Sequence, residues 1–276
     1  MKVFTFFYNR YETATTSKAL WENDIAHSIL IHSNEDYDKF VKGKTLYGKP
    51  FITNNEKGLA YQRNTALDMM DEGEWAVFMC DDFKQIKSVP EQILESNQKK
   101  IDINFGNQHI YRFKNKDIIS LKKMFIYFPK LIELAEKNKI HLIGFGLHDN
   151  PLNLRNRFTT RGLADGRFWL VKKSNYKFDI RAQLIDDVAW TAENLIRHNN
   201  VLVLNWIVPE FRRYTKGGFG STEERKSLRK AECTYLAYKF NPLVRIAEKK
   251  NWDYGTHIKI FGSDNNIEIA RKKLLL

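Results

Sequence analysis

The sequence contains few of the residues that build disulfide frameworks. Only two cysteines occur, Cys80 and Cys233, and they lie far apart along the chain. Two isolated thiols indicate no disulfide framework and fit a reducing compartment. With 43% hydrophobic residues, the chain can bury a full core without cross-links. We expect Cys80 to be a small buried residue at the end of a strand.

Several common functional motifs are also absent. The chain has no zinc-ligand spacing, no P-loop, no GxGxxG and no nucleophile elbow. The apolar run near residue 1 is too short for a signal peptide, and no segment approaches the length of a membrane span. We therefore expect a soluble, cytoplasmic protein with no membrane span.

Positive charge is concentrated in two segments. The formal net charge is +12. Residues 151–181 contain eight Lys or Arg and two acids, which gives +6, and residues 211–276 contain fifteen and seven, which gives +8. The rest of the chain is nearly neutral, at −2 (12 − 14). Basic charge confined in this way indicates either a face that binds a polyanion or a lysine-rich surface without a function.

A run of apolar residues, Trp75 to Cys80, ends in the carboxylates of Asp81 and Asp82. A continuous apolar run of this length is typical of a strand buried on both faces. Ligands of open α/β sheets bind beyond the carboxyl ends of the strands, and Mg²⁺ is usually held there by one or two carboxylates plus substrate phosphates. The pair is therefore a candidate cation site, although it also fits a solvated or capping pair at the start of a loop.

Strand-like and helix-like segments alternate along the first eighty residues, which predicts an α/β fold with a mostly parallel central sheet flanked by helices. Further helices are expected over 117–139, interrupted at Pro129, and over 185–198 and 221–240. We expect one domain, with a donor-nucleotide half over 1–115 and an acceptor half with a basic C-terminal segment over 116–276. The remaining expected elements are strands at 2–8, 28–32, 51–55, 141–147, 167–171 and 201–208, and helices at 13–24, 35–41, 58–71 and 91–98, with two further strands at 101–105 and 109–113.

Polar residues recur in a fixed order at the predicted strand and helix ends. Asn9-Arg10 follow the first strand, and Asn54-Asn55 precede a helix that starts at Gly58 and contains Arg63-Asn64. Asp81-Asp82 end the buried strand, and Asp186-Asp187 open a helix about a hundred residues later. This order resembles that of the GT-A class of nucleotide-sugar glycosyltransferases and, within it, the phage-encoded TET-associated group that modifies DNA bases. The likeness extends over roughly 3–250, and the segment from Gly58 to Asp82 is its most specific part.

The resemblance implies a function and a set of residues. It implies transfer of a sugar, such as glucose, from a UDP-sugar to a hydroxymethylated base of phage DNA, such as hydroxymethylcytosine or an already glucosylated base. It implies Mn²⁺ or Mg²⁺ as cofactor and the host cytoplasm as location. The family has Asp-Asp-Asp where this chain has Cys80-Asp81-Asp82, so the resemblance does not extend to the donor or metal contact of the first aspartate. The implied roles are Asp82 and His257 for the metal; Tyr8, Asn9, Arg10, Asn54, Arg63, Asn64 and Asp81 for the nucleotide-sugar, with Arg63 on a phosphate; and Asp187 with Asp186 for deprotonating or positioning the acceptor hydroxyl.

The basic segments are the expected contacts for duplex DNA. Cationic side chains position a duplex through its phosphates without reading its sequence. The enzyme would reach a protruding group in the major groove or flip the base out. The candidate contacts are Arg155, Arg157, Arg161, Lys216, Arg225 and Lys226.

Two other functions fit the same residues. The first is a GT-A glycosyltransferase that uses a polysaccharide or lipid-linked acceptor, with the basic surface against a membrane face. The second is a metal-dependent DNA-binding or nuclease-type protein, in which the paired acids hold a cation for phosphodiester chemistry. Nucleotide-sugar binding separates the second from both transferases.

Overall fold

The computed structural model of the chain describes residues 1–7, 14–42, 47–53, 58–88, 117–146, 158–212, 222–247 and 256–275. The strands of its main sheet are β1 (Lys2–Phe7), β2 (Ser28–Ile31), β3 (Lys49–Ile52), β4 (Trp75–Cys80), β7 (Leu142–Phe145), β8 (Phe158–Thr159), β9 (Phe168–Lys172) and β10 (Leu202–Leu204). They lie in the order β3-β2-β1-β4-β9-β7-β10-β8. Only β9 and β8 run against the common direction. The predicted α/β fold with a mostly parallel sheet is confirmed.

Two smaller sheets accompany the main one. An antiparallel sheet has the order β11-β5-β6, and a two-stranded ribbon pairs β12 with β13. Their strands are β5 (Phe83–Ser88), β6 (Asp117–Ile119), β11 (Ile207–Phe211), β12 (Val244–Ala247) and β13 (His257–Ile260).

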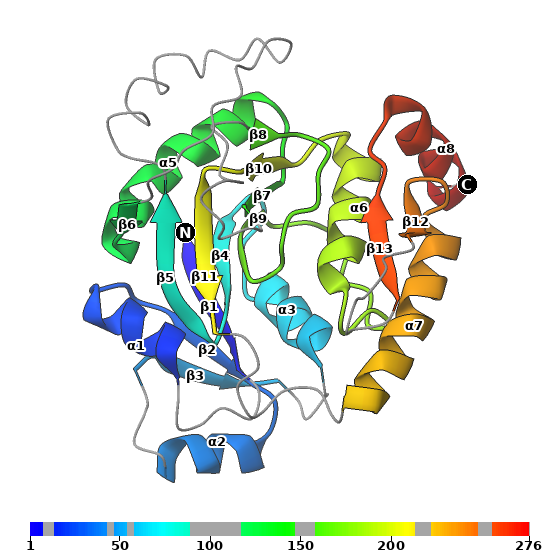
Figure 1. Cartoon of the computed structure of the whole chain (residues 1–276). Coiled ribbons are helices and arrows are strands. Elements are labelled where there is room, and N and C mark those ends of the chain that lie inside the picture. Colours follow the sequence, from blue (N-terminus) through cyan, green and yellow to red (C-terminus); the bar gives the residue numbers. More distant parts are fainter. Residues whose placement is uncertain are drawn as a thin grey trace.

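The described helices cover both faces of the main sheet. They are α1 (Thr15–Glu22), α2 (Asn34–Lys42), α3 (Leu59–Asp68), α5 (Leu121–Lys137), α6 (Asp186–His198), α7 (Thr222–Lys239) and α8 (Asp264–Leu275). One apolar cluster joins α3, α6, α7, α8 and the β12–β13 ribbon to one face, and a second joins α1, α5, β5 and β11 to the other. In Figure 1, α6, α7, α8 and the β12–β13 ribbon lie at the right of the view, α3 lies near the centre, and α1 and α5 lie at the left.

Strand β4 is the centre of this arrangement. Trp75 is 5% exposed, and every residue from Ala76 to Met79 is fully buried. Because side chains alternate along a strand, Ala76 and Phe78 join the first cluster, while Val77 and Met79 join the second. The prediction that the Trp75 run is a strand buried on both faces is confirmed.

Three predictions about secondary structure need correction. The single strand expected over 201–208 is wrong, because β10 and β11 belong to different sheets with a turn between them. Helix α5 continues through Pro129 instead of splitting there. The tail contains β13 and α8, which its sequence pattern did not indicate. The elements expected at 91–98, 101–105 and 109–113 lie outside the described residues.

Within the described residues, no helix is both long and apolar enough to cross a membrane.

Candidate functional site

The strand order reverses at β1. Strands β2 and β3 lie on one side of β1, and β4 lies on the other. In open α/β sheets, ligands bind beyond the carboxyl ends of the strands at such a reversal. Asp81 and Asp82 follow β4 at this point, whereas Tyr8, Asn9 and Arg10 follow β1 outside the described residues, as does Asn54 after β3.

The start of α1 holds the turn that carries the two aspartates. Thr16 Oγ1 donates to the carbonyl of Cys80 at 2.5 Å and accepts from the amide of Phe83 at 2.9 Å. Thr16 is fully buried, and its own amide donates to the carbonyl of Asp81 at 3.3 Å. On the other side, the amide of Arg212 donates to the carbonyl of Asp82 at 2.8 Å. The backbone of the turn is therefore held from two sides, which makes it a firm support for its carboxylates.

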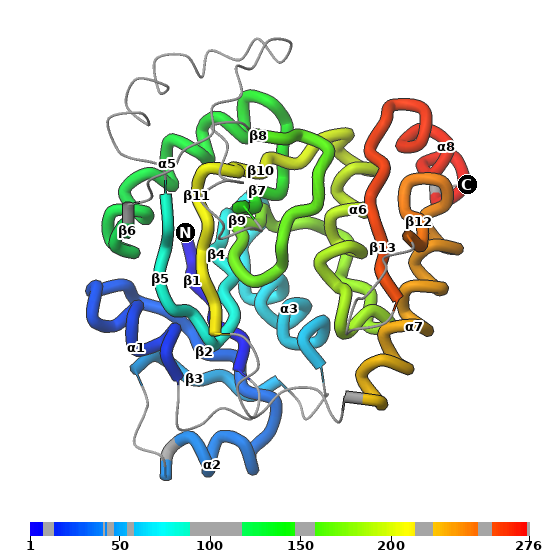
Figure 2. The backbone as a smooth tube through the Cα atoms, in the orientation of Figure 1, coloured from blue at the N-terminus to red at the C-terminus, as the bar shows by residue number. Residues whose placement is uncertain are grey.

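Strand β9 brings a second charged segment to the same place. Because β9 runs antiparallel to β4, its first residues lie beside the last residues of β4, and the amide of Cys80 donates to the carbonyl of Arg167 at 2.9 Å. Figure 2 shows the two strands side by side although they are far apart in sequence. Asp165, Gly166 and Arg167 thus join the site, a set that the sequence analysis missed. The sequence feature that could have indicated this set is a glycine between an acid and a base, Asp165-Gly166-Arg167, directly before an apolar strand.

The guanidinium of Arg167 donates three hydrogen bonds to the carboxylate of Asp165. Its Nε donates to Oδ1 at 2.8 Å, and one terminal nitrogen donates to Oδ2 at 2.7 Å. Within the described part of the chain, its other terminal nitrogen has no hydrogen-bond partner, and 31% of the side chain is exposed. The guanidinium lies over the ring of Phe211 at 5.5 Å, next to the Arg212 amide that holds the turn. It is a partly exposed, oriented cation near the aspartate turn.

Arg63 occupies the interior of the site. Its side chain is 1% exposed, one terminal nitrogen forms an ion pair with Asp186, and the other donates to the carbonyl of Gly166 at 2.5 Å. The guanidinium also lies over the ring of Trp169 at 4.4 Å. The predicted contact between Arg63 and a donor phosphate is thereby revised, because a buried guanidinium with these partners instead positions Asp186.

Gly166 fits between Arg63 and Asp187. A Cβ atom at Gly166 would lie 3.1 Å from both terminal nitrogens of Arg63 and 3.1 Å from the Cβ of Asp187. These contacts are tighter than ordinary van der Waals contact, so only glycine fits without displacing a neighbour. The close approach fixes the start of β9 against both α3 and α6.

The two aspartates that open α6 have raised pKa values. Burial raises the pKa of Asp186 to about 6, although the nearby Arg63 lowers it. Burial, together with the charges of Asp165 and Asp186, raises the pKa of Asp187 to about 7. Asp187 also accepts a hydrogen bond from the amide of Val188 at 2.8 Å. A carboxylate with a pKa near neutral pH is well matched to proton transfer.

Cys80 lies within the electrostatic reach of both aspartate pairs. Burial raises the pKa of its thiol, Arg63 lowers it, and the charges of Asp82, Asp81 and Asp186 raise it further. Contacts link the two pairs as well: the Gly166 carbonyl accepts from the Cys80 thiol at 4.0 Å and from Arg63 at 2.5 Å, and Arg63 pairs with Asp186.

The predicted metal ligands Asp82 and His257 follow β4 and begin β13, respectively. Across the described ranges, no group of three or more His, Cys, Asp or Glu side chains is arranged to hold a metal ion. His257 begins β13 opposite Ala247. Carboxylate oxygens nevertheless suit Mg²⁺ and Mn²⁺, and Mg²⁺ often takes only one or two protein ligands when substrate phosphates supply others. The chemistry of Asp82 and Asp81 fits a cation shared with a substrate, not an all-protein cage.

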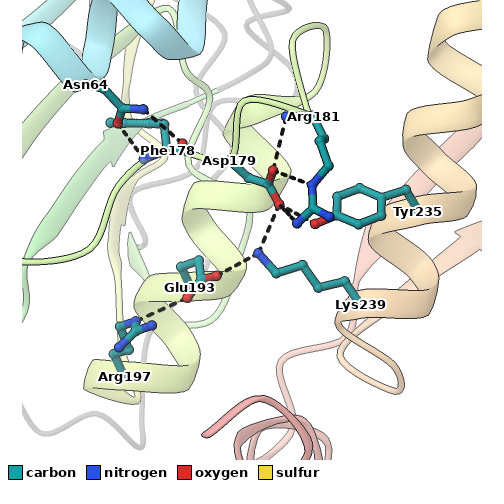
Figure 3. Close-up of polar contacts among 8 residues, drawn as sticks. All are labelled: Asn64, Phe178, Asp179, Arg181, Glu193, Arg197, Tyr235 and Lys239. Carbon is teal, nitrogen blue, oxygen red and sulfur yellow. Dashed lines mark hydrogen bonds and ion pairs between the residues drawn. The ribbon is translucent and has the colours of Figure 1, made fainter.

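Asn64 has a different environment from the one expected of a nucleotide-sugar ligand. Its amide nitrogen donates to the carbonyl of Phe178 at 3.0 Å, and its amide oxygen accepts from the Phe178 amide at 2.7 Å. Figure 3 shows this reciprocal pair between α3 and the segment before α6. Asn64 therefore anchors that segment.

The predicted DNA contacts are only partly described. Arg161 pairs with Asp264 at 2.5 Å, Lys226 pairs with Glu223 at 2.9 Å, and Arg225 is exposed. Arg155, Arg157 and Lys216 lie outside the described residues.

No protein-family model matches the chain, and no curated protein is significantly similar to it.

Proposed function

We propose that the chain is a metal-dependent glycosyltransferase of the GT-A type, which moves a sugar from a UDP-sugar to a hydroxymethylated base in duplex DNA. The observation that carries the proposal is the convergence of two aspartate pairs at the strand-order reversal. One pair ends β4 and the other opens α6. The carbonyl of Gly166 joins them, because it accepts from the Cys80 thiol and from Arg63, the ion-pair partner of Asp186. Transfer from a diphosphate donor needs cation-binding oxygens and a proton acceptor close together, and this arrangement supplies both.

Each charged group has a separate task in this reaction. Asp82, supported by Asp81, would hold Mg²⁺ or Mn²⁺ together with oxygens of the donor. When bound, the cation supplies Lewis-acid stabilisation of the departing diphosphate. Arg167 adds a second positive charge for the same diphosphate, because its guanidinium is oriented by Asp165 and still partly exposed. It takes over the role that the sequence interpretation gave to Arg63.

Asp187 is the acceptor-activating group. Its raised pKa favours proton uptake from a hydroxyl near neutral pH. Asp186 is less suited to that role because it is ion-paired with the buried Arg63. Arg63, Asp186 and Gly166 instead hold the start of α6 in position.

Duplex DNA is the acceptor that the overall charge supports. The formal net charge is +12, and the excess lies in segments 151–181 and 211–276. A cationic surface binds the phosphate backbone of DNA with little regard to sequence. The acceptor hydroxyl then belongs to a base modification that projects into the major groove or is flipped out.

The deciding experiment measures the thermal shift of the full chain with UDP-sugars, with and without Mn²⁺. We expect stabilisation that requires both ligands, and we expect D82N to abolish it. D71N is the matched control, because Asp71 is an exposed carboxylate at the opposite end of β4, 88% exposed. A wild-type response without Mn²⁺, or an unchanged response in D82N, would contradict the metal assignment.

Activity assays then separate the acceptors. Incorporation of labelled sugar into hydroxymethylcytosine DNA is the expected result. Transfer that ignores DNA but uses a lipid-linked or polysaccharide acceptor would favour the second transferase function. Binding of DNA and Mn²⁺ without any UDP-sugar response would favour the nuclease-type alternative.

A further inference from the structure

The β12–β13 ribbon places two cations directly opposite each other. In its antiparallel register, Arg245 is the partner of Lys259, and both side chains are exposed. Val244 and Ile258, on the alternate face, are buried in the core shared with α6 and α7. One face of the ribbon is therefore fixed against the protein, and the other presents a paired positive charge.

This pairing is unfavourable for the ribbon itself. Side chains of directly opposed residues have Cβ atoms about 5 Å apart, and like charges at that separation destabilise the pair. Neither β12 nor β13 contains an acidic residue. Among the described residues, Arg245 and Lys259 form no ion pair; Arg245 donates to the carbonyl of Pro242 at 3.0 Å and lies over the ring of Phe261 at 5.0 Å. Within the part of the chain that the structure describes, these two neighbouring cations therefore have no anionic partner.

We infer that the outward face of the ribbon binds phosphates of the acceptor DNA duplex. This inference rests on the proposed function and adds a partner surface to it. Duplex DNA carries about one negative charge per 1.7 Å of its axis, so it can neutralise adjacent cations together. A two-stranded ribbon is also narrow enough for the major groove, about 12 Å wide.

A predicted DNA contact lies at the end of the same ribbon. Gly262 follows β13 and approaches Arg161 so closely that a Cβ atom would lie 2.6 Å from the Arg161 carbonyl. Arg161 also pairs with Asp264, the first residue of α8. Arg161 therefore lies beside the end of the ribbon, and Phe261, 40% exposed, follows β13 and contacts Arg245.

Neutral substitutions test the phosphate contacts. Affinity for a duplex is measured by fluorescence anisotropy over a range of salt concentrations for wild type, R245Q and K259Q. Each lost phosphate contact lowers the slope of log affinity against log salt by about 0.9. K130Q is the matched control, because Lys130 is exposed on α5, which packs on the opposite face of the sheet. A slope unchanged in both ribbon variants would overturn the inference.

A charge reversal separates binding from folding. K259E replaces repulsion from Arg245 with attraction, so the melting temperature is expected to hold or rise while affinity for DNA falls further than in K259Q. If K259E also lowers the melting temperature and the protection of the ribbon's amides from hydrogen exchange, its lower DNA affinity is due to misfolding. That result would overturn the inference.

Two further measurements complete the test, one of binding to lipid vesicles and one of binding to the sugar donor. Vesicles containing phosphatidylserine replace DNA in the same variants; loss of vesicle binding with intact DNA binding would overturn the inference in favour of a lipid surface. The Mn²⁺-dependent UDP-sugar shift is expected to persist in R245Q and K259Q. If the wild type lacks that shift but the ribbon variants still lose DNA binding, the proposed function fails and the DNA surface stands.

Discussion

The guanidinium of Arg63 and the carboxylate of Asp186 form an ion pair inside the protein, with side-chain exposures of 1% and 7%. The pair joins α3 to the first residue of α6, and its arginine also binds the carbonyl of Gly166. Buried ion pairs are costly to break, because removing one partner leaves an isolated charge in a region of low polarity. This pair therefore controls the position of Asp187, the next residue of the helix.

We predict that R63M destabilises the protein by about 3 to 5 kcal/mol at pH 8, the usual cost of breaking a buried pair. The loss should be smaller at pH 5, because the pKa of Asp186 is about 6 and a protonated carboxyl needs no cation. Urea unfolding at both pH values measures it. D186N in the R63M background should recover much of the stability, and R225M, at an exposed arginine of α7, should change little. Equal losses at both pH values would count against the ion-pair explanation.

Asp187 is predicted to make folding stability fall as the pH rises. Its pKa of about 7 in the folded protein exceeds the ordinary value of 3.8, so the native state binds more protons than the unfolded state between these limits. Stability is therefore lost as the pH rises through this window. D187N should be about as stable as wild type near pH 4 and more stable at pH 8. The difference should be up to about 4 kcal/mol, because the pKa shift is about 3 units at about 1.4 kcal/mol each. Urea titrations of the two proteins test the sign, and a less stable D187N at pH 8 would refute it.

The same pKa sets the pH dependence of the proposed reaction. A general base must be ionised, so kcat/KM should rise with pH through an apparent pKa of about 7. Because the charge of Asp165 raises the pKa of Asp187, D165N should move this limb to lower pH. A limb that stays in place in D165N would show that another group titrates.

How much of this site the sequence could predict depends on how local each feature is. The aspartate turn follows a continuous apolar strand, and Asp186-Asp187 stand where acids commonly open helices, so both pairs are visible in the sequence. Asp165 and Arg167 enter only because β9 lies between β4 and β7 in antiparallel orientation. That topology is a long-range property that no local pattern encodes.

The burial of Arg63 could not be predicted for a related reason. The apolar spacing over 58–71 predicts a helix, and the resemblance implies that Arg63 contacts a phosphate, yet both Gln62 and Arg63 are buried. Gln62 donates to the carbonyls of Phe7 and Leu30, and Arg63 is surrounded by aromatic rings and an anion from other elements. A polar residue becomes internal when distant segments supply its partners, and those partners appear only in three dimensions.

Arg167 is predicted to bind the donor's diphosphate. R167Q removes the charge but keeps a polar side chain beside Asp165, so the fold should persist. The KM for UDP-sugar should increase at least tenfold, because a charge-assisted bond to phosphate is worth about 1.5 to 3 kcal/mol. R212Q is the comparison variant, because the contact of Arg212 with the aspartate turn is made by its backbone amide. Equal effects of the two substitutions on KM would remove Arg167 from the donor site.

Gly166 is predicted to tolerate no side chain. G166A introduces a Cβ atom 3.1 Å from the Arg63 nitrogens and from the Cβ of Asp187, and overpacking of this kind costs about 1 to 3 kcal/mol. G146A is a matched control, since its Cβ atom would lie 3.0 Å from Val208 Cγ2 at the end of β7. Both variants should lose stability, but only G166A should lower the turnover of the folded fraction and shift its pH profile. Similar kinetics in the two variants would separate Gly166 from the site.

A charged network holds α7 against α6. Asp179 accepts hydrogen bonds from Arg181, Tyr235 and Lys239, and Lys239 also binds Glu193 at 2.9 Å (Figure 3). Burial opposes the ionised form of Asp179, but these hydrogen bonds outweigh it and hold the pKa of its carboxyl well below the usual range. The network lies between the segment before the Asp186-Asp187 pair and the helix that leads into the ribbon.

We predict that D179N weakens this junction by about 3 kcal/mol at pH 7, in the range for a broken buried pair. Because the folded pKa of Asp179 is depressed, its contribution is present above the ordinary pKa of about 4 and is lost as the pH falls below it. The difference between D179N and wild type should therefore narrow below pH 4. D68N makes the same change in the exposed pair of Asp68 with Lys177, 64% and 43% exposed, and should cost less than about 1 kcal/mol. Urea unfolding from pH 3 to pH 7 measures both variants, and a D179N deficit that stays constant over this range would contradict the network's electrostatic role.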